Sequence, residues 1–288
     1  MQSPLTIQNA LKEKLNKSSL IFQPVNGGSI NQAYRVTTDD RKYFCKINSA
    51  IAFPQLFIKE SNGLEEIRKT KTIKVPAFID CFEMEDQQVL LMEWIKEGER
   101  SGKFWKNFGI SLAALHSISN DQYGFKENNY MGSIQQCNNW NSNWNSFFIE
   151  QRLKPLVEKC ITKSLLTNKH LAAFEKLYTH LPQFFEDQPP ALLHGDLWNG
   201  NFMCNDRSEP VLIDPAIYFG HRSMDLAMTA LFGGFDSLFY KAYQSAYSFP
   251  TNYSAQWKVC NLYPLLIHLL LFGKGYLLQT EQILNEFA

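Results

Sequence analysis

The chain has 288 residues, 45% of them apolar, a size and composition that suit one or two globular domains. Its 28 basic and 28 acidic residues balance, which excludes a global field that would attract nucleic acid or an anionic membrane. Six cysteines without a CxxC pair, and an N-terminus without the apolar core of a signal peptide, predict a reduced, cytoplasmic protein.

A short helix and three strands are predicted first. Ser3-Pro4 is typical of a helix start, and apolar residues at helical spacing follow as far as Leu15. Apolar and polar residues then alternate in residues 21–25, 32–36 and 42–47, with turn-forming residues between these runs. We expect a three-stranded antiparallel meander.

Two features of this meander resemble parts of a nucleotide site. Gly27-Gly28-Ser29 lies in the first turn, where glycines let backbone amides approach a phosphate, although such a pair is usually only a hairpin turn. Lys46 lies on the third strand within an apolar run, where an unpaired ammonium would be costly. A helix predicted over residues 53–69 supplies Glu60 as its partner. In kinases such a lysine contacts the α- and β-phosphates and such a glutamate holds it; exposed strand and helix positions are the alternatives.

A hairpin is predicted over residues 77–93, with a turn at Glu85-Asp86. The strand pattern stops after Glu93, where a small lobe would pass into a larger one. Backbone groups of Glu93 and Ile95 are candidates to pair with adenine, with Met92 at the back of that pocket. A plain strand-to-loop exit is the alternative. We therefore expect an N-terminal nucleotide-binding lobe over residues 1–93 and a C-terminal catalytic and acceptor-binding lobe over residues 94–288.

The second lobe is predicted to be mainly helical. The expected helices cover residues 104–117, 144–160, 169–180 and 221–232, with three more over residues 236–286. The apolar run 262–272 contains His268 and is too short to span a bilayer, so a buried helix is expected there. His116 is expected to be buried or capping. Residues 120–145 have no clear periodicity, and either a binding loop or a packed connection is consistent with them.

The segment that predicts chemistry is LLHGDLWNGNF, followed by VLIDPA. Each part begins with a short apolar strand and ends on polar side chains that packing does not require. Asp196 precedes Asn201 by five positions, and Asp214 follows on the next strand, which is the spacing of a kinase catalytic loop. Asp196 would accept the proton of the acceptor hydroxyl, and Asn201 and Asp214 would hold Mg2+ beside ATP. A plain turn is the alternative for the first part alone.

Two features follow this segment. Residues 215–220 are too few for an activation loop controlled by phosphorylation, which favours a small-molecule kinase. Asp225 could accept backbone amides of the catalytic loop, in a supporting role.

These motifs, together with VNGGSINQAYRV, FCKIN and LLMEWI, resemble the fructosamine kinase or ketosamine-3-kinase family, within the aminoglycoside and choline kinase-like superfamily. The resemblance covers nearly the whole chain. It implies an α+β, two-lobed protein kinase-like fold, with an antiparallel sheet in the small lobe and a mainly helical large lobe. It also implies transfer of phosphate from ATP, with Mg2+, to the 3-hydroxyl of a ketosamine, whose unstable 3-phosphate then releases the amine.

The resemblance implies roles by position. Asp196 is the base, Asn201 and Asp214 are metal ligands, Lys46 with Glu60 anchors phosphate, and Gly27-Gly28-Ser29 is the phosphate loop. Trp198 matches a family tryptophan near the substrate sugar, although a core tryptophan is an equal alternative. Some family members carry a cysteine in the phosphate loop; the matching position here is Ser29, so redox control through it is not expected.

The expected partner is a small ketosamine, a glycated amine or a glycated protein. Binding to nucleic acid or to a membrane is not expected. The protein is expected to be a monomer or a weak dimer. Two other hypotheses remain open. One is a kinase of another hydroxylated molecule, such as an aminoglycoside or choline, and the other is a nucleotide-binding protein without catalysis.

Overall fold

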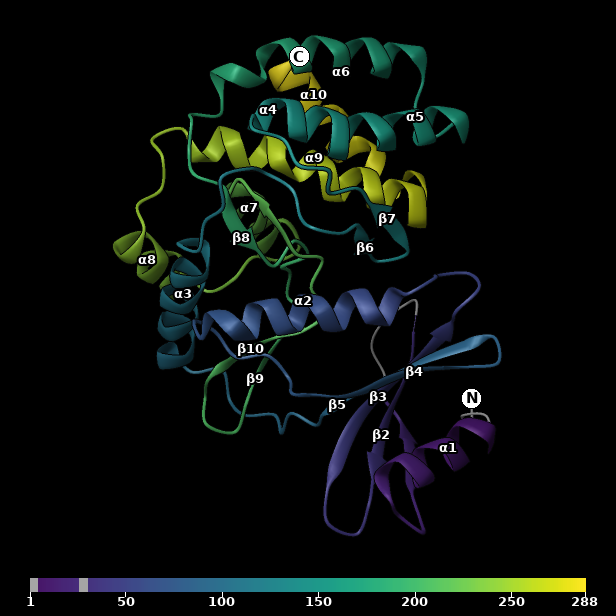
Figure 1. Cartoon of the computed structure of the whole chain (residues 1–288). Coiled ribbons are helices and arrows are strands. Elements are labelled where there is room, and N and C mark those ends of the chain that lie inside the picture. Colours follow the sequence, from purple (N-terminus) through teal and green to yellow (C-terminus); the bar gives the residue numbers. More distant parts are fainter. Residues whose placement is uncertain (1–4, 26–30) are drawn as a thin grey trace.

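The computed structural model describes residues 5–25 and 31–288 and has the expected α+β, two-lobed kinase-like architecture (Figure 1). The small lobe contains one antiparallel sheet in the order β1-β2-β3-β5-β4. Its strands are β1 (Ile21–Pro24), β2 (Gln32–Thr37), β3 (Lys42–Ser49), β4 (Phe78–Met84) and β5 (Gln87–Glu93). The predicted meander and hairpin are therefore parts of a single sheet. In these two described stretches, no helix combines the length and apolar character needed to cross a membrane.

The two faces of this sheet are covered by different helices. Side chains alternate between faces along a strand, so Val89 and Leu91 pack against helix α1 (Leu5–Leu15). Leu90 and Met92 pack against helix α2 (Leu56–Thr70) on the other face. Lys46 pairs with Leu90 across the β3–β5 ladder, and this register places it on the face that α2 covers.

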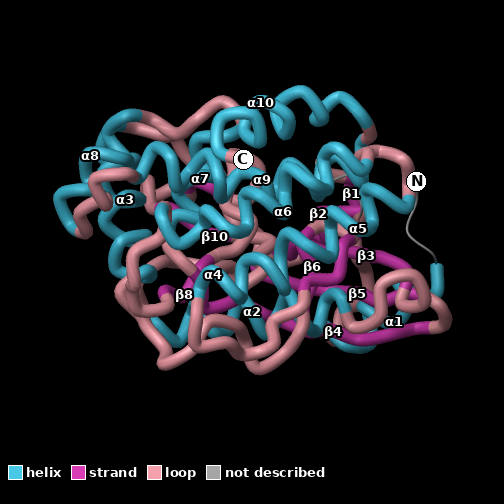
Figure 2. The backbone as a smooth tube through the Cα atoms, turned by 90° about the horizontal axis from the view of Figure 1, so that it is seen from above, coloured by secondary structure: helices cyan, strands magenta, loops and turns pink. Residues whose placement is uncertain are grey.

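The large lobe is mainly helical, and most of its buried side chains form one continuous core. Figure 2 shows α3 and α8 at one end of the molecule and the sheet with α1 at the other. The α-helices are α3 (Gly102–His116), α4 (Trp144–Phe147), α5 (Lys154–Thr162), α6 (Asn168–His180), α7 (Ser223–Leu231), α8 (Ser237–Ala246), α9 (Tyr253–Phe272) and α10 (Leu277–Phe287). Short 3-10 turns cover Leu181–Gln183 and Lys274–Tyr276.

Three small antiparallel pairs in the large lobe lie around the site. They are β6 (Asn129–Met131) with β7 (Ile134–Gln136), β9 (Phe202–Cys204) with β10 (Pro210–Leu212), and β8 (Ala191–Leu193) with β11 (Tyr218–Gly220). Because β11 pairs with β8, the segment after Asp214 returns to the strand that leads into Asp196. The end of this segment, Tyr218–Gly220, is therefore held by the β8–β11 pairing.

Several predicted boundaries differ from the structure. Helix α2 begins at Leu56 rather than residue 53, because Gln55 has a left-handed backbone with φ 60° that ends the preceding turn. The helix expected over residues 144–160 is interrupted by a π-helical segment at Phe148–Leu153. Residues 120–145, which showed no periodicity, contain the β6–β7 hairpin. The Ser3-Pro4 helix start lies outside the described residues.

Candidate active site

The β9–β10 hairpin brings Asn201 and Asp214 together. Asn201 directly precedes β9, Asp214 follows β10 by two residues, and Phe202 pairs with Leu212 at the open end. The Ile213 amide donates to the Asn201 carbonyl at 3.1 Å. Two residues thirteen positions apart therefore share one end of a short hairpin, whose first strand the sequence interpretation did not predict.

The loop that carries Asp196 is fixed by a buried carboxylate. Asp225 accepts hydrogen bonds from the backbone amides of His194 and Gly195, at 2.7 and 2.8 Å. Burial alone would raise the pKa of Asp225, but hydrogen bonding from the His116 side chain and the loop amide holds it below the ordinary value. The supporting role predicted for Asp225 is confirmed, and His116 is buried as expected.

Gly195 is required by the close approach of the next segment. Its φ is 85°, and a Cβ atom there would lie 2.1 Å from the Ala216 carbonyl oxygen. The Ala216 amide in turn donates to the His194 carbonyl at 2.9 Å, and His194 Nε2 lies 2.8 Å from the Ile213 carbonyl oxygen. The loops of Asp196 and Asp214 are thus joined directly, which limits movement of one carboxylate relative to the other.

Lys46 lies between two carboxylates, one from each lobe. Its Nζ is 2.7 Å from Glu60 Oε1 and 2.5 Å from Asp214 Oδ1. Burial acts to lower the pKa of Lys46, but the attraction of Asp214 and Glu60 outweighs it and raises the pKa above the ordinary value. The ammonium therefore stays charged. The predicted Lys46–Glu60 contact is present, and its role in phosphate binding remains a prediction.

Asp196 has an environment suited to proton transfer. Its Oδ2 accepts from Asn201 Nδ2 at 2.8 Å, and the same nitrogen donates to the Asp196 carbonyl at 2.9 Å. Burial raises the pKa of Asp196 to about 7; the Asn201 hydrogen bond opposes the shift, and the charges of Asp214 and Asp225 add to it. A carboxylate with this pKa is a stronger base than an exposed one at neutral pH.

The donor atoms at this site fit Mg2+. Asn201 uses its amide nitrogen on Asp196, so its Oδ1 has no hydrogen-bond partner among the described residues. Asp214 shares Oδ1 with Lys46, and its carboxylate is 37% exposed toward the cavity. Carboxylate and carboxamide oxygens are the hard ligands that Mg2+ prefers. Asn201 and Asp214 could therefore hold the ion through these two oxygens.

The predicted adenine contacts lie at the end of β5. The Glu93 amide already donates to the Ala77 carbonyl at 2.8 Å, so only its carbonyl is a candidate. No hydrogen bond from the Ile95 amide is formed within the described part of the chain. Met92 is buried against α2, as its predicted place at the back of a pocket requires. Gly27-Gly28-Ser29 lies outside the described residues.

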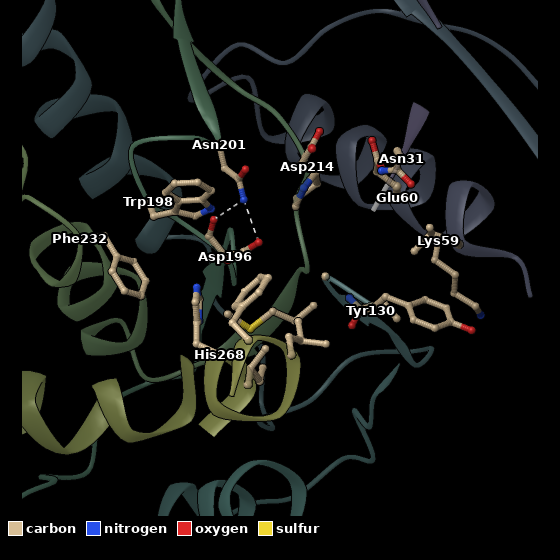
Figure 3. A pocket seen from close by; sticks show the side chains of 18 of the residues that line it. Asn31, Lys59, Glu60, Tyr130, Asp196, Trp198, Asn201, Asp214, Phe232 and His268 are labelled. Atoms are coloured by element: carbon tan, nitrogen blue, oxygen red, sulfur yellow. Dashed lines mark hydrogen bonds between the residues drawn. The ribbon is translucent and has the colours of Figure 1, made fainter. Parts of the chain in front are cut away.

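Asp196, Asn201, Asp214, Glu60 and Trp198 all line one cavity of about 680 Å³ between the lobes (Figure 3). Lys46 lies behind it, almost fully buried. Trp198 is 39% exposed and faces the cavity, so it is not a core residue. Its ring also lies against Gly200, where a Cβ atom would come within 2.5 Å of it.

Aromatic side chains that the sequence interpretation missed form the end of this cavity beside Trp198. Phe232 lies 6.4 Å from Trp198 and 4.7 Å from His268, measured between ring centroids, and Tyr276 lies 5.0 Å from His268. His268 Nδ1 is 2.8 Å from the Pro264 carbonyl, and burial lowers the pKa of this imidazole. It is therefore neutral at pH 7, with its hydrogen on Nδ1. In the sequence these residues look like an ordinary buried helix and its exit.

The opposite wall comes from the β6–β7 hairpin, held by a buried polar network. Asn129 donates to the Ile217 carbonyl at 2.8 Å, and Gln136 donates to the Ala216 carbonyl at 3.0 Å. Arg152, in the π-helical segment, donates to the Asn138 side chain at 2.7 Å, and Asn138 donates to Asn129 at 3.1 Å. This network fixes the wall to the segment that follows Asp214.

Known proteins resemble this chain over nearly all of its length. The family model for fructosamine kinase matches residues 4–288. A Synechocystis protein named provisionally as a ketoamine kinase is 38% identical over 268 residues, covering 91% of this chain and 88% of the relative. A protein of Mus musculus named ketosamine-3-kinase is 31% identical over 311 residues, covering 98% and 100%.

Solved structures also resemble this chain over nearly all of its length. A Thermobifida fusca crystal structure, named provisionally as a fructosamine-3-kinase, has a TM-score of 0.86 and 30% identity, covering 97% of each chain. An aminoglycoside phosphotransferase in a ternary complex with AMP-PNP and hygromycin B has a TM-score of 0.64 at 13% identity, covering 97% of this chain and 96% of that one. The second likeness concerns the fold alone.

Proposed function

The chain belongs to the fructosamine kinase family and is a phosphotransferase with an alcohol group as acceptor, and on this premise we propose that it phosphorylates the 3-hydroxyl of a ketosamine. ATP is the proposed donor, in keeping with the AMP-PNP complex of a protein with the same fold. The 3-phosphate then decomposes and frees the amine, so the reaction leads to deglycation.

The roles we propose follow from where the side chains lie. Asp196, with one carboxylate oxygen free of protein partners among the described residues, takes the proton of the acceptor hydroxyl. The acceptor oxygen forms a bond to the γ-phosphorus as the bond from that phosphorus to the bridging oxygen breaks, and ADP leaves with the electron pair. Lys46, held by Glu60, contacts the phosphates. Trp198 packs against the sugar.

Asn201 and Asp214 are the proposed Mg2+ ligands. When bound, the ion neutralises phosphate charge during transfer. Lys46 then has to exchange part of its contact with Asp214 for contacts with phosphate oxygens, because the Asp214 carboxylate and the phosphate compete for the same ammonium. Glu60 keeps the ammonium in place during that exchange.

We further assign residues 1–93 to the nucleotide-binding lobe, with the phosphate loop at Gly27-Gly28-Ser29 and adenine beside Met92, the Glu93 carbonyl and the Ile95 amide. Residues 94–288 form the catalytic and acceptor-binding lobe. The proposed setting is the cytoplasm, and the proposed assembly is a monomer or weak dimer.

The observation that best supports this proposal is the pairing of Asp196 with Asn201 in the cavity that also contains Asp214 and Trp198. The test is ATP consumption by the purified protein with Mg2+ and a synthetic ketosamine, with the phosphate position determined by phosphorus NMR. We expect a 3-phosphate that decays to free amine. Tight ATP binding without turnover would contradict the choice of acceptor.

The cavity does not favour a polycationic acceptor such as an aminoglycoside. The carboxylates among its described lining residues are Glu60, Asp196 and Asp214. Glu60 and Asp214 already contact Lys46, and Asp196 is the proposed base. Few negative charges are therefore left to bind several ammonium groups.

A further inference from the structure

Lys59 and Tyr130 line the cavity that contains Asp196. These two side chains also line a second hollow of about 560 Å³. Figure 3 shows Lys59 and Tyr130 at one end of the first cavity and Trp198, Phe232 and His268 at the other, with Asp196 and Asp214 between them. The second hollow therefore adjoins the first cavity at the end away from Trp198, Phe232 and His268.

The chemistry of the second hollow differs from that of the aromatic end. Its polar lining consists of hydrogen-bonding side chains and one cation: Gln55, Lys59, Asn128, Tyr130, Ser133 and Gln135. Among the described residues, no carboxylate lines it. A ligand group that enters this hollow therefore meets neutral amides, hydroxyl groups and one positive charge. Such a surface suits a polar or anionic group and disfavours a second cation.

Lys59 is held at the boundary between the two hollows. Its Nζ lies 2.9 Å from Glu127 Oε2, and both side chains are about one-fifth exposed, at 19% and 21%. Glu127 also accepts a hydrogen bond from Asn62 at 2.9 Å and lines neither hollow. An ammonium has three hydrogens, so a contact with Glu127 behind it leaves donors free for a ligand in front.

The shape of a ketosamine matches this arrangement. Its 3-hydroxyl must reach Asp196, and carbon 3 lies between the sugar tail and carbon 1, which bears the amine. The two halves of the molecule therefore extend in opposite directions from Asp196. With the sugar tail against Trp198, the amine half is directed toward Lys59 and Tyr130, where the second hollow offers space for amines of different size.

Resting on the proposed function, we propose that this second hollow binds the amine-derived half of the ketosamine and that Lys59 selects amines that carry a carboxylate, such as amino acids. A charge-assisted hydrogen bond of this kind should raise kcat/KM by about tenfold or more. Amines with a second positive charge are selected against by the same side chain.

The test compares ketosamines of one sugar made from matched amines: 4-aminobutyrate with butylamine, and glycine with ethylamine. For the wild type we expect kcat/KM to be about tenfold higher for each carboxylate acceptor. Lys59→Met keeps the apolar stem without the charge, and the ratio should fall to about one. Glu127→Gln removes the competing carboxylate, and the ratio should rise a few-fold. If Lys59 had a purely structural role, its replacement would change kcat/KM for both acceptors of a pair by the same factor and leave their ratio unchanged.

The outcomes separate the two proposals. Equal turnover of both acceptors by the wild type, or an unchanged ratio in Lys59→Met, would overturn the proposed subsite and leave ketosamine kinase activity intact. No turnover of any of the four acceptors would overturn the proposed function, and the subsite with it. Nucleotide affinity of each variant, measured by titration with AMP-PNP and Mg2+, reports whether the variant is folded. The Glu127→Gln result decides the question if Lys59→Met does not fold.

Discussion

The proposed nucleotide-facing and acceptor-facing halves of the site are built differently. The first uses Lys46, Asn201 and Asp214, each at a fixed position on or beside a short strand and joined by ion pairs or backbone hydrogen bonds. The second collects side chains from five segments: α2, the β6–β7 hairpin, the loop with Trp198, the end of α7, and the end of α9 with the turn that follows it. Phosphate chemistry is common to kinases, whereas the acceptor differs between them. The half that must vary is thus built from separate segments.

Asp196 lies where the two halves meet, and its replacement should have the largest effect. Asp196→Asn keeps the size of the side chain and removes the base, so kcat should fall about 10²- to 10⁴-fold. Nucleotide binding, measured by calorimetry with AMP-PNP, should remain within about twofold. Near-normal turnover would contradict the role assigned to Asp196.

Asp214→Ala should weaken nucleotide binding without changing the acceptor-facing side chains. Loss of one of the two proposed protein ligands weakens Mg2+ binding, so Mg2+-dependent nucleotide affinity should fall about 100-fold, equivalent to about 2.8 kcal/mol. The measurement is a Mg2+ titration at fixed AMP-PNP. Asp206→Ala is a control, because that carboxylate is exposed and contacts Lys96 at 3.4 Å. A titration curve unchanged from the wild type would exclude Asp214 as a ligand.

The pH dependence tests the burial of Asp196. Its pKa is raised to about 7, so in the nucleotide-free protein the carboxylate gains a proton as the pH falls through that value. Because the base must be ionised, kcat should fall about tenfold per pH unit below the pKa that Asp196 has with Mg2+ and ATP bound, which should lie below 7. Carbon-13 NMR of the carboxyl groups should show a titration near pH 7 that is missing in Asp196→Asn. Bound metal should shift it to lower pH, since positive charge favours the carboxylate.

Trp198→Ala should give the smallest effect and should be confined to the acceptor half. Loss of the ring contact should raise KM for the ketosamine about tenfold or less, equivalent to about 1.4 kcal/mol. KM for ATP should change little, and Trp198→Phe should restore part of the loss. Equal changes in both KM values would show that the ring supports the loop and does not contact the acceptor.

The nucleotide half was predictable because local spacing determines it. Asp196 and Asp214 follow short strands, Asn201 directly precedes the strand that pairs with β10, and Lys46 faces α2 because strands alternate. Phe232, His268 and Tyr276 were not predictable, since their apolar spacing is that of any buried helix and only tertiary packing brings them to Trp198. The β6–β7 hairpin was also missed, because its strands have three residues each and are held by the amide side chains of Asn129 and Gln136.

The short β9–β10 hairpin also determines what a hinge motion would separate. Asn201 and Asp214 lie on one rigid unit, so opening of the lobes would move them together. Lys46 belongs to the other lobe, and its 2.5 Å contact with Asp214 crosses the gap. Opening would therefore leave the proposed metal ligands assembled and break this contact. The Lys46–Asp214 ion pair thus links the two lobes in the nucleotide-free protein. Phosphate oxygens that bind Lys46 would replace this contact with Asp214, and the ion pair could form again after they leave.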